Sequence, residues 1–162
     1  MKHKSVDFEN SGAMMKNDEN TLIPRELQAG VFNGKGIFDF GERNDAYADY
    51  FTGTSFLSLL NLQGVTVANV TFEPGCRNFW HIHHKGGQIL LVTGGKGWYQ
   101  EFGHPAQELL PGKVVYIAPG TKHWHGAAKD SWFAHVAVEI PAEGARNEWL
   151  EQVSDEEYNA LT

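Results

Sequence analysis

The chain has 162 residues, of which 41% are hydrophobic and 12% aromatic, and it contains 18 glycines. A chain of this length suits one domain and buries roughly 70% of its unfolded surface, so it needs no metal to hold a core together. The formal net charge of −7 argues against a nucleic-acid or anionic-membrane partner, and no stretch reaches the roughly 20 apolar residues of a membrane span.

Residues 1–26 are polar and mixed in charge, which predicts an N-terminal tail or extension outside the folded domain. They lack the apolar stretch of a secretory signal. The chain has one cysteine, Cys76, which cannot form an internal disulfide and therefore suits a reducing compartment. We expect a cytoplasmic protein.

Residues 27–140 hold a succession of short β-type runs separated by glycine, proline and asparagine. The runs are GIFDF (36–40), TSFLSLL (54–60), VTVANVTFE (65–73), NFWHIH (78–83), QILLVTG (88–94), GWYQEF (97–102), AQELL (106–110), KVVYIAP (113–119), HWHGAA (123–128) and WFAHVAVEI (132–140). Turn residues at intervals of eight to twelve positions predict an all-β sandwich or barrel over this region.

Two short helical segments are expected, one between the first two β-type runs and one near the C-terminus. A helical turn is expected in NDAYADYF (44–51), and residues 141–162 form a C-terminal segment with a short helix in SDEEYNAL (154–161). Ser154 is placed to cap that helix, and Glu157 completes a capping box.

Histidines are concentrated in the predicted barrel. His81 and His83 alternate along one strand, so both rings point to one face with Cα atoms about 6.6 Å apart, close enough to converge on one ion. The glycine pair 86–87 predicts a tight turn that brings the next strand back beside the first, with Gln88 at its start. His123 follows a later turn. We expect His81, His83, Gln88 and His123 to form a four-ligand metal site.

Each of these residues also has an ordinary structural interpretation. A strand histidine is more often a hydrogen-bonded core residue than a ligand, and Gln88 could merely support the turn while water completes the coordination. His125 lies on the same strand face as His123, and His135 lies on the same face as Phe133 and Ala137. Each could be a general base, or a barrel histidine whose hydrogen bonds are satisfied by neighbouring groups. Four tryptophans could line an apolar pocket or simply fill the core: Trp80, Trp98, Trp124 and Trp132.

The spacing of these motifs resembles the cupin family. Gly75, the pair His81 and His83, Gln88 and Gly94 look like the first cupin motif, and the stretch from Gly112 through KVVYIAPG to His123 looks like the second. The resemblance spans residues 65–140. It implies a jelly-roll β-barrel with one divalent metal ion held by the four predicted ligands. The family usually has glutamate at the position of Gln88, and the second motif has Ala118 and Ala127 where proline and asparagine are usual.

A longer pattern is similar to a subgroup of bacterial single-domain cupins. The segments FTGT, VTFEPG, PGTKHWHGAA and EWLEQVSDEEY resemble manganese-dependent hydroxynitrile lyases and cupins associated with carboxymuconolactone decarboxylase-like proteins. Glutamine as a ligand is characteristic of that subgroup. The resemblance implies manganese, with iron, zinc or nickel as alternatives. It also implies that the substrate cavity is lined by Ala68, Val70, Asn78, His125, His135 and Glu139. The lyases have threonine where this chain has Asn78 and glutamine where it has Glu139.

The neutral side chain of Gln88 has a chemical consequence. Three neutral imidazoles and an amide leave the full 2+ charge of the ion, whereas a glutamate ligand would leave 1+. The excess charge strengthens the ion as a Lewis acid, favours an anion such as an alkoxide or cyanide, and does less to stabilise a higher-valent metal.

Three functions remain open at the level of sequence. The first is a metal-dependent lyase that polarises the oxygen of a small substrate, with His125 or His135 moving the proton. The second is a cupin dioxygenase or isomerase, and the third is a module that binds a small molecule without turnover. We also expect a homodimer, which the resemblance implies and which would bury the apolar residues of TLIPRELQAGVF (21–32).

Overall fold

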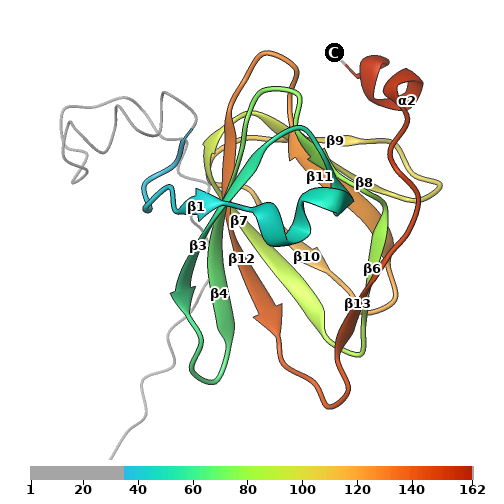
Figure 1. The fold of residues 1–162 in the computed structure, drawn as a ribbon. Coiled ribbons are helices and arrows are strands. Elements are labelled where there is room, and N and C mark those ends of the chain that lie inside the picture. Colours follow the sequence, from blue (N-terminus) through green and yellow to red (C-terminus); the bar gives the residue numbers. More distant parts are fainter. Residues whose placement is uncertain (1–34, 162) are drawn as a thin grey trace, which may run out of the picture.

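The computed structural model describes residues 35–161, and its strands form two antiparallel sheets of a jelly-roll barrel (Figure 1). The first sheet has the order β1 (Glu42–Arg43), β3 (Ser55–Asn61), β4 (Thr66–Phe72), β12 (Phe133–Ile140), β7 (Gly87–Gly95) and β10 (Val114–Ile117). The second has the order β13 (Arg146–Trp149), β6 (His81–His84), β11 (Lys122–Ala127), β5 (Arg77–Asn78) and β2 (Phe51–Thr52), with β8 (Gly97–Glu101) and β9 (Gln107–Leu109) attached through β11. The predicted all-β class and jelly-roll architecture are confirmed.

The alternation of side chains along the strands explains the core. On β7, Leu90 and Val92 are buried while Leu91 between them is 38% exposed, because successive side chains point to opposite faces of a sheet. The inward side chains of both sheets form one apolar cluster, which includes Phe72, Cys76, Leu90, Val92, Tyr99, Leu109, Ile117, Ala127, Phe133 and Ala137. This cluster fills one part of the barrel and leaves the rest to the histidines.

Both flanking helical segments form where the sequence predicts them. A 3-10 helix, η1, spans Asp45–Tyr50, and helix α2 spans Asp155–Asn159. Ser154 caps α2 through the predicted capping box with Glu157. Within residues 35–161, no helix is long and apolar enough to cross a membrane.

The run GIFDF (36–40) is not a strand, so that prediction was wrong. Glycines with positive φ, Gly36 and Gly41, bracket the run and turn the chain out of an extended ladder. The segment instead lies over the first sheet: the Asn69 amide donates to the carbonyl oxygen of Asp39, and the Phe40 ring packs 4.2 Å from that of Phe56.

The glycine pair 86–87 makes a different connection from the expected one. β6 pairs with β11 and β13, whereas β7 pairs with β10 and β12, so the turn carries the chain from one sheet to the other. A Cβ at Gly87 would lie 2.6 Å from the carbonyl oxygen of Ile117, which explains the need for glycine at this crossing. Gln88 still stands at the start of its strand.

The sheets extend beyond the predicted barrel of residues 27–140. Strand β13 lies in the predicted C-terminal segment and pairs with β6 through Asn147↔His83 and Trp149↔His81. Its four residues, RNEW, carry too little apolar character for the pattern to predict a strand. The predicted tail of residues 1–26 and the first part of the predicted barrel, 27–34, lie outside the described residues.

Candidate metal centre

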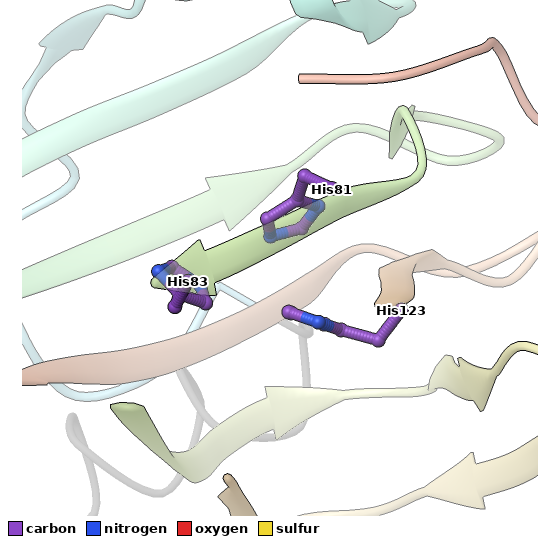
Figure 2. A group of neighbouring side chains, drawn as sticks. All are labelled: His81, His83 and His123. Carbon is purple, nitrogen blue, oxygen red and sulfur yellow. The ribbon is translucent and has the colours of Figure 1, made fainter. Parts of the chain in front are cut away.

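Three of the four predicted ligands converge in the barrel. His81 and His83 point from β6 toward His123 on β11, as Figure 2 shows. One nitrogen from each ring lies within 4.8 Å of the other two, and all three residues are buried. The register places His123 directly opposite His81. The arrangement suits a single metal ion bound by three imidazoles.

Hydrogen bonds to oxygen fix the tautomer of each ring. The Nδ1 atom of His81 lies 2.8 Å from the carbonyl oxygen of Phe79, and that of His123 lies 2.9 Å from the carbonyl oxygen of Thr121. An oxygen that can only accept requires a proton on Nδ1, so Nε2 keeps its lone pair. The Nε2 atoms of His83 and His123 are buried without a hydrogen-bond partner, as expected for ligand atoms.

Burial favours the neutral form of His81 and of His123. It lowers the pKa of His81 well below its usual value, and the neighbouring His123 and His83 lower that pKa further. Burial also lowers the pKa of His123 to about 4. Neutral imidazole is the form that binds a metal, so burial keeps His81 and His123 in the metal-binding form at physiological pH.

Gln88 enters the same cavity from the facing sheet. Its amide nitrogen donates a hydrogen bond to Glu139, the residue directly opposite on β12. Since the nitrogen is held by Glu139, the amide oxygen Oε1 points elsewhere, and it is buried without a partner. This free acceptor lies in the cavity that His81 and His83 also line, and it fits the predicted fourth ligand.

A cavity of about 360 Å³ adjoins the histidines. All six side chains predicted to line the substrate cavity do line it: Ala68, Val70, Asn78, His125, His135 and Glu139. The cavity wall also carries many apolar side chains, among them Tyr47, Phe51, Leu57, Phe72 and Trp149. A mainly apolar wall with a few convergent polar groups is typical of a small-molecule site.

His125 and His135 lie side by side at the inner end of this cavity, with ring centroids 4.9 Å apart. The Asn78 oxygen accepts from the backbone N–H of His125, so its amide nitrogen is the atom that donates to the His125 ring, 3.1 Å from Nε2. Both ring nitrogens of His135 are buried without a partner. Of this pair, His135 is therefore the histidine whose ring is not held by another side chain.

Two residues of β13 belong to the site but were not predicted. Asn147 Oδ1 lies 2.7 Å from Nδ1 of His83 and holds that ring in the metal-binding tautomer. Trp149 packs against His81 with ring centroids 4.7 Å apart and stacks on Tyr50 at the same distance. The available signal was the alternation of Asn147 and Trp149 with the charged residues Arg146 and Glu148.

The four tryptophans considered from the sequence lie elsewhere. Trp80 and Trp124 pack with Val153 and Tyr158 of the C-terminal segment, with Trp98 beside them, outside the cavity. Trp132 packs against Phe40 on the other side of the first sheet.

Comparison with known proteins agrees with the fold. The family model described as "Cupin domain" matches residues 68–138. The chain is 45% identical over 115 residues to an (R)-mandelonitrile lyase of Granulicella tundricola, an alignment that covers 68% of this chain and 87% of that protein. This chain is a cupin. The predicted family is confirmed.

Solved structures place the cupin among similar barrels. A cupin-like protein of Thermotoga maritima shares 43% identity and a TM-score of 0.72, over 78% of this chain and 96% of that one. A dimethylsulfoniopropionate (DMSP) lyase of Ruegeria pomeroyi, DddQ, has 15% identity and a TM-score of 0.53, over 73% and 61% of the two chains. The second likeness concerns the fold alone.

The donor set of this cupin fits a divalent ion. Nε2 of His83, Nε2 of His123 and Oε1 of Gln88 are buried polar atoms without partners in the structure, and such atoms are costly unless something binds them. His81 completes the group. Nitrogen and neutral oxygen donors suit first-row divalent metals.

Replacing Asn147 with leucine is expected to weaken metal binding by about 10–100-fold, because His83 loses the acceptor that fixes its tautomer. The dissociation constant for manganese, measured by competition with a chelator, checks this. Glu148→Leu is the matched control, since Glu148 bonds His84 outside the metal group. Equal loss in both variants would show that β13 as a whole, rather than Asn147, supports the site.

The stability of the metal-free protein is expected to fall as the pH drops from about 6.5 toward 4. Burial lowers the pKa of His135 to about 4, from an ordinary 6.5. Between these two pKa values His135 binds a proton in the unfolded chain but not in the folded chain, so acid favours unfolding. Urea unfolding at several pH values measures the effect. The variant His135→Leu should show a shallower pH dependence than the wild type, and an identical dependence would contradict the prediction.

Proposed function

We propose that this cupin is a metal-dependent lyase that cleaves small hydroxynitriles to a carbonyl compound and hydrogen cyanide. The 45% identity to an (R)-mandelonitrile lyase, over 87% of that protein, carries the proposal. The neutral donor set of His81, His83, Gln88 and His123 supports it, with manganese as the proposed ion and iron, zinc or nickel as alternatives. When bound, the ion supplies a Lewis acid that stabilises negative charge on oxygen or cyanide.

His135 is the proposed base. Its ring is neutral, because burial lowers its pKa to about 4, and neither ring nitrogen has another partner. It accepts the hydroxyl proton of the substrate as the carbonyl forms and the carbon–cyanide bond breaks, and it then returns the proton to the departing cyanide. His125, held by Asn78, orients the substrate beside it.

The apolar wall supports a substrate with an aromatic or bulky apolar group. Phe51, Leu57, Val70 and Trp149 line the cavity on the way to the histidines. They would exclude water from the reacting group and bury the apolar part of the substrate, leaving its hydroxyl to the polar end.

The test is turnover of racemic mandelonitrile by protein whose metal content has been measured. Manganese-loaded protein is expected to release benzaldehyde, followed by its absorbance, faster than metal-stripped protein. No difference between the two would overturn the lyase proposal. Oxygen consumption by iron-loaded protein would favour a dioxygenase, and ligand binding without turnover would favour a binding module.

We propose further that the protein is a cytoplasmic homodimer. Its one cysteine, Cys76, is buried and free, which suits a reducing compartment. The outer face of the first sheet exposes apolar side chains on β7 and its edge strand β10: Leu91 is 38%, Val114 62% and Tyr116 61% exposed. A second copy packed on this face would cover both the side chains and the strand edge.

Light scattering at micromolar concentration is expected to give twice the mass of the chain. Val114→Lys with Tyr116→Lys should convert the protein to a monomer without loss of metal. Leu62→Lys is the control, since Leu62 is 65% exposed in the loop after β3. A monomeric wild type would end the proposal.

A further inference from the structure

Glu139 stands just outside the metal ligands and contacts two of them. It lies on β12, directly opposite Gln88 on β7. One of its carboxylate oxygens accepts the hydrogen bond from the Gln88 amide, and the other lies 3.6 Å from Nδ1 of His83. The sequence resemblance implied that Glu139 lines a substrate cavity. Glu139 lines the cavity beside the histidines, and the two contacts above join it to predicted metal ligands.

The contact with Gln88 changes what its amide can do. A hydrogen bond to a carboxylate is charge-assisted, and it draws the amide toward the form with more negative charge on its oxygen. That oxygen, Oε1, is the buried atom without a partner. Glu139 therefore makes the amide oxygen of Gln88 a stronger ligand for a cation. It also holds the orientation of the amide group.

The charge of the site points the same way. Three neutral imidazoles and an amide would leave a divalent ion with its full charge in a buried setting, which is costly. Among the described residues that line the cavity, Glu139 is the one carboxylate. It is one hydrogen bond away from the ligand Gln88 and is partly exposed at its outer end, with 37% of its side chain accessible.

We propose that Glu139 is the counter-charge of the metal centre and acts through Gln88 and His83. In a glutamate-ligated site a carboxylate would bind the ion directly. Here the carboxylate of Glu139 instead contacts the residues that would bind the ion. Glu139 then raises the affinity for the ion while leaving its coordinating atoms neutral, and it limits how strongly the ion attracts an anion. This role rests on the proposed metal-dependent function, and it makes Glu139 a positioning residue rather than a catalytic one.

The test is Glu139→Gln, which keeps the size and an acceptor oxygen but removes the charge. Chelator competition in the absence of substrate is expected to show manganese affinity lowered by about 10–100-fold. Titration of the cobalt-loaded variant with azide, followed by visible absorption, is expected to show binding at least about 3-fold tighter than in the wild type. Glu148→Gln, on the strand beside His83, is the matched control and should change neither value.

A charge-swapped variant separates charge from geometry. Gln88→Glu together with Glu139→Gln moves the carboxylate inward and keeps one hydrogen-bonded pair, so manganese affinity is expected to return to at least the wild-type value. This variant also serves if Glu139→Gln alone does not fold. Unchanged metal and azide binding in Glu139→Gln, or no recovery in the swapped variant, would overturn the proposal.

These measurements do not depend on the identity of the substrate. A wild type that fails to cleave mandelonitrile would remove the lyase proposal, yet the changes in manganese and azide binding would still establish Glu139 as the counter-charge. Conversely, lower turnover in Glu139→Gln with unchanged metal and azide binding would return Glu139 to a role in the substrate cavity and overturn the inference.

Discussion

Replacing His83 with alanine is expected to abolish stoichiometric metal binding, and turnover with it. His83 supplies one of the three convergent imidazoles, and its Nε2 is buried without another partner. With two imidazoles and an amide left, the site lacks the donors that a divalent ion requires. Elemental analysis of the purified variant, followed by a manganese titration, measures the loss.

The adjacent histidine provides the control. His84 lies on the same strand but outside the convergent group, and its Nε2 lies 2.5 Å from a carboxylate oxygen of Glu148. His84→Ala should keep its metal content and turnover. If His83→Ala binds manganese as tightly as His84→Ala does, the three histidines are not the metal ligands.

Replacing His135 with alanine is expected to lower kcat by about 10²–10⁴-fold while leaving the metal content unchanged. His135 does not belong to the convergent group, but it lines the same cavity with both ring nitrogens free. Its loss removes a proton acceptor and no metal donor. Mandelonitrile turnover and elemental analysis, made on the same preparation, separate the two effects.

His104→Ala is the control for this experiment, because His104 is exposed in the turn after β8. His125→Ala gives the useful comparison: its ring already accepts from Asn78, so a smaller loss of rate is expected than for His135→Ala. Wild-type turnover in His135→Ala would leave this histidine without a catalytic role. Loss of metal in His135→Ala would instead show that His135 contributes to metal binding.

Local patterns predicted which histidine side chains share a face, because strand periodicity is a local property. The alternation of His81 and His83 was enough to place both rings on one face, and the later HWH run placed His123 and His125 on another. Gln88 was found through the glycines before it. The pairing of the strands was not local, and here the prediction failed: the glycine pair was expected to join neighbours in one sheet but joins two sheets.

The residues that orient the ligands could not be predicted in this way. Asn147 contacts His83 across 64 positions of sequence, and Glu139 contacts Gln88 across 51. Such contacts depend on which strands become neighbours, and a polar residue near the end of a chain carries no signal of its future partner. In the run 36–40 an apolar pattern was present but misleading. It reflects packing over a sheet and not a place within one.

The late position of β13 in the chain delays the orientation of one predicted ligand during synthesis. His83 leaves the ribosome 64 residues before Asn147, the residue that fixes its tautomer. At about 5–20 residues per second, the nascent chain carries His83 for roughly 3–13 seconds before β13 can pair with it. During that interval the ring of His83 lacks the acceptor that selects its tautomer. A metal that bound then would follow the general order of affinities, which favours copper and zinc over manganese. If the site is loaded during synthesis, the metals available at that time, as well as the finished pocket, would determine which ion it holds.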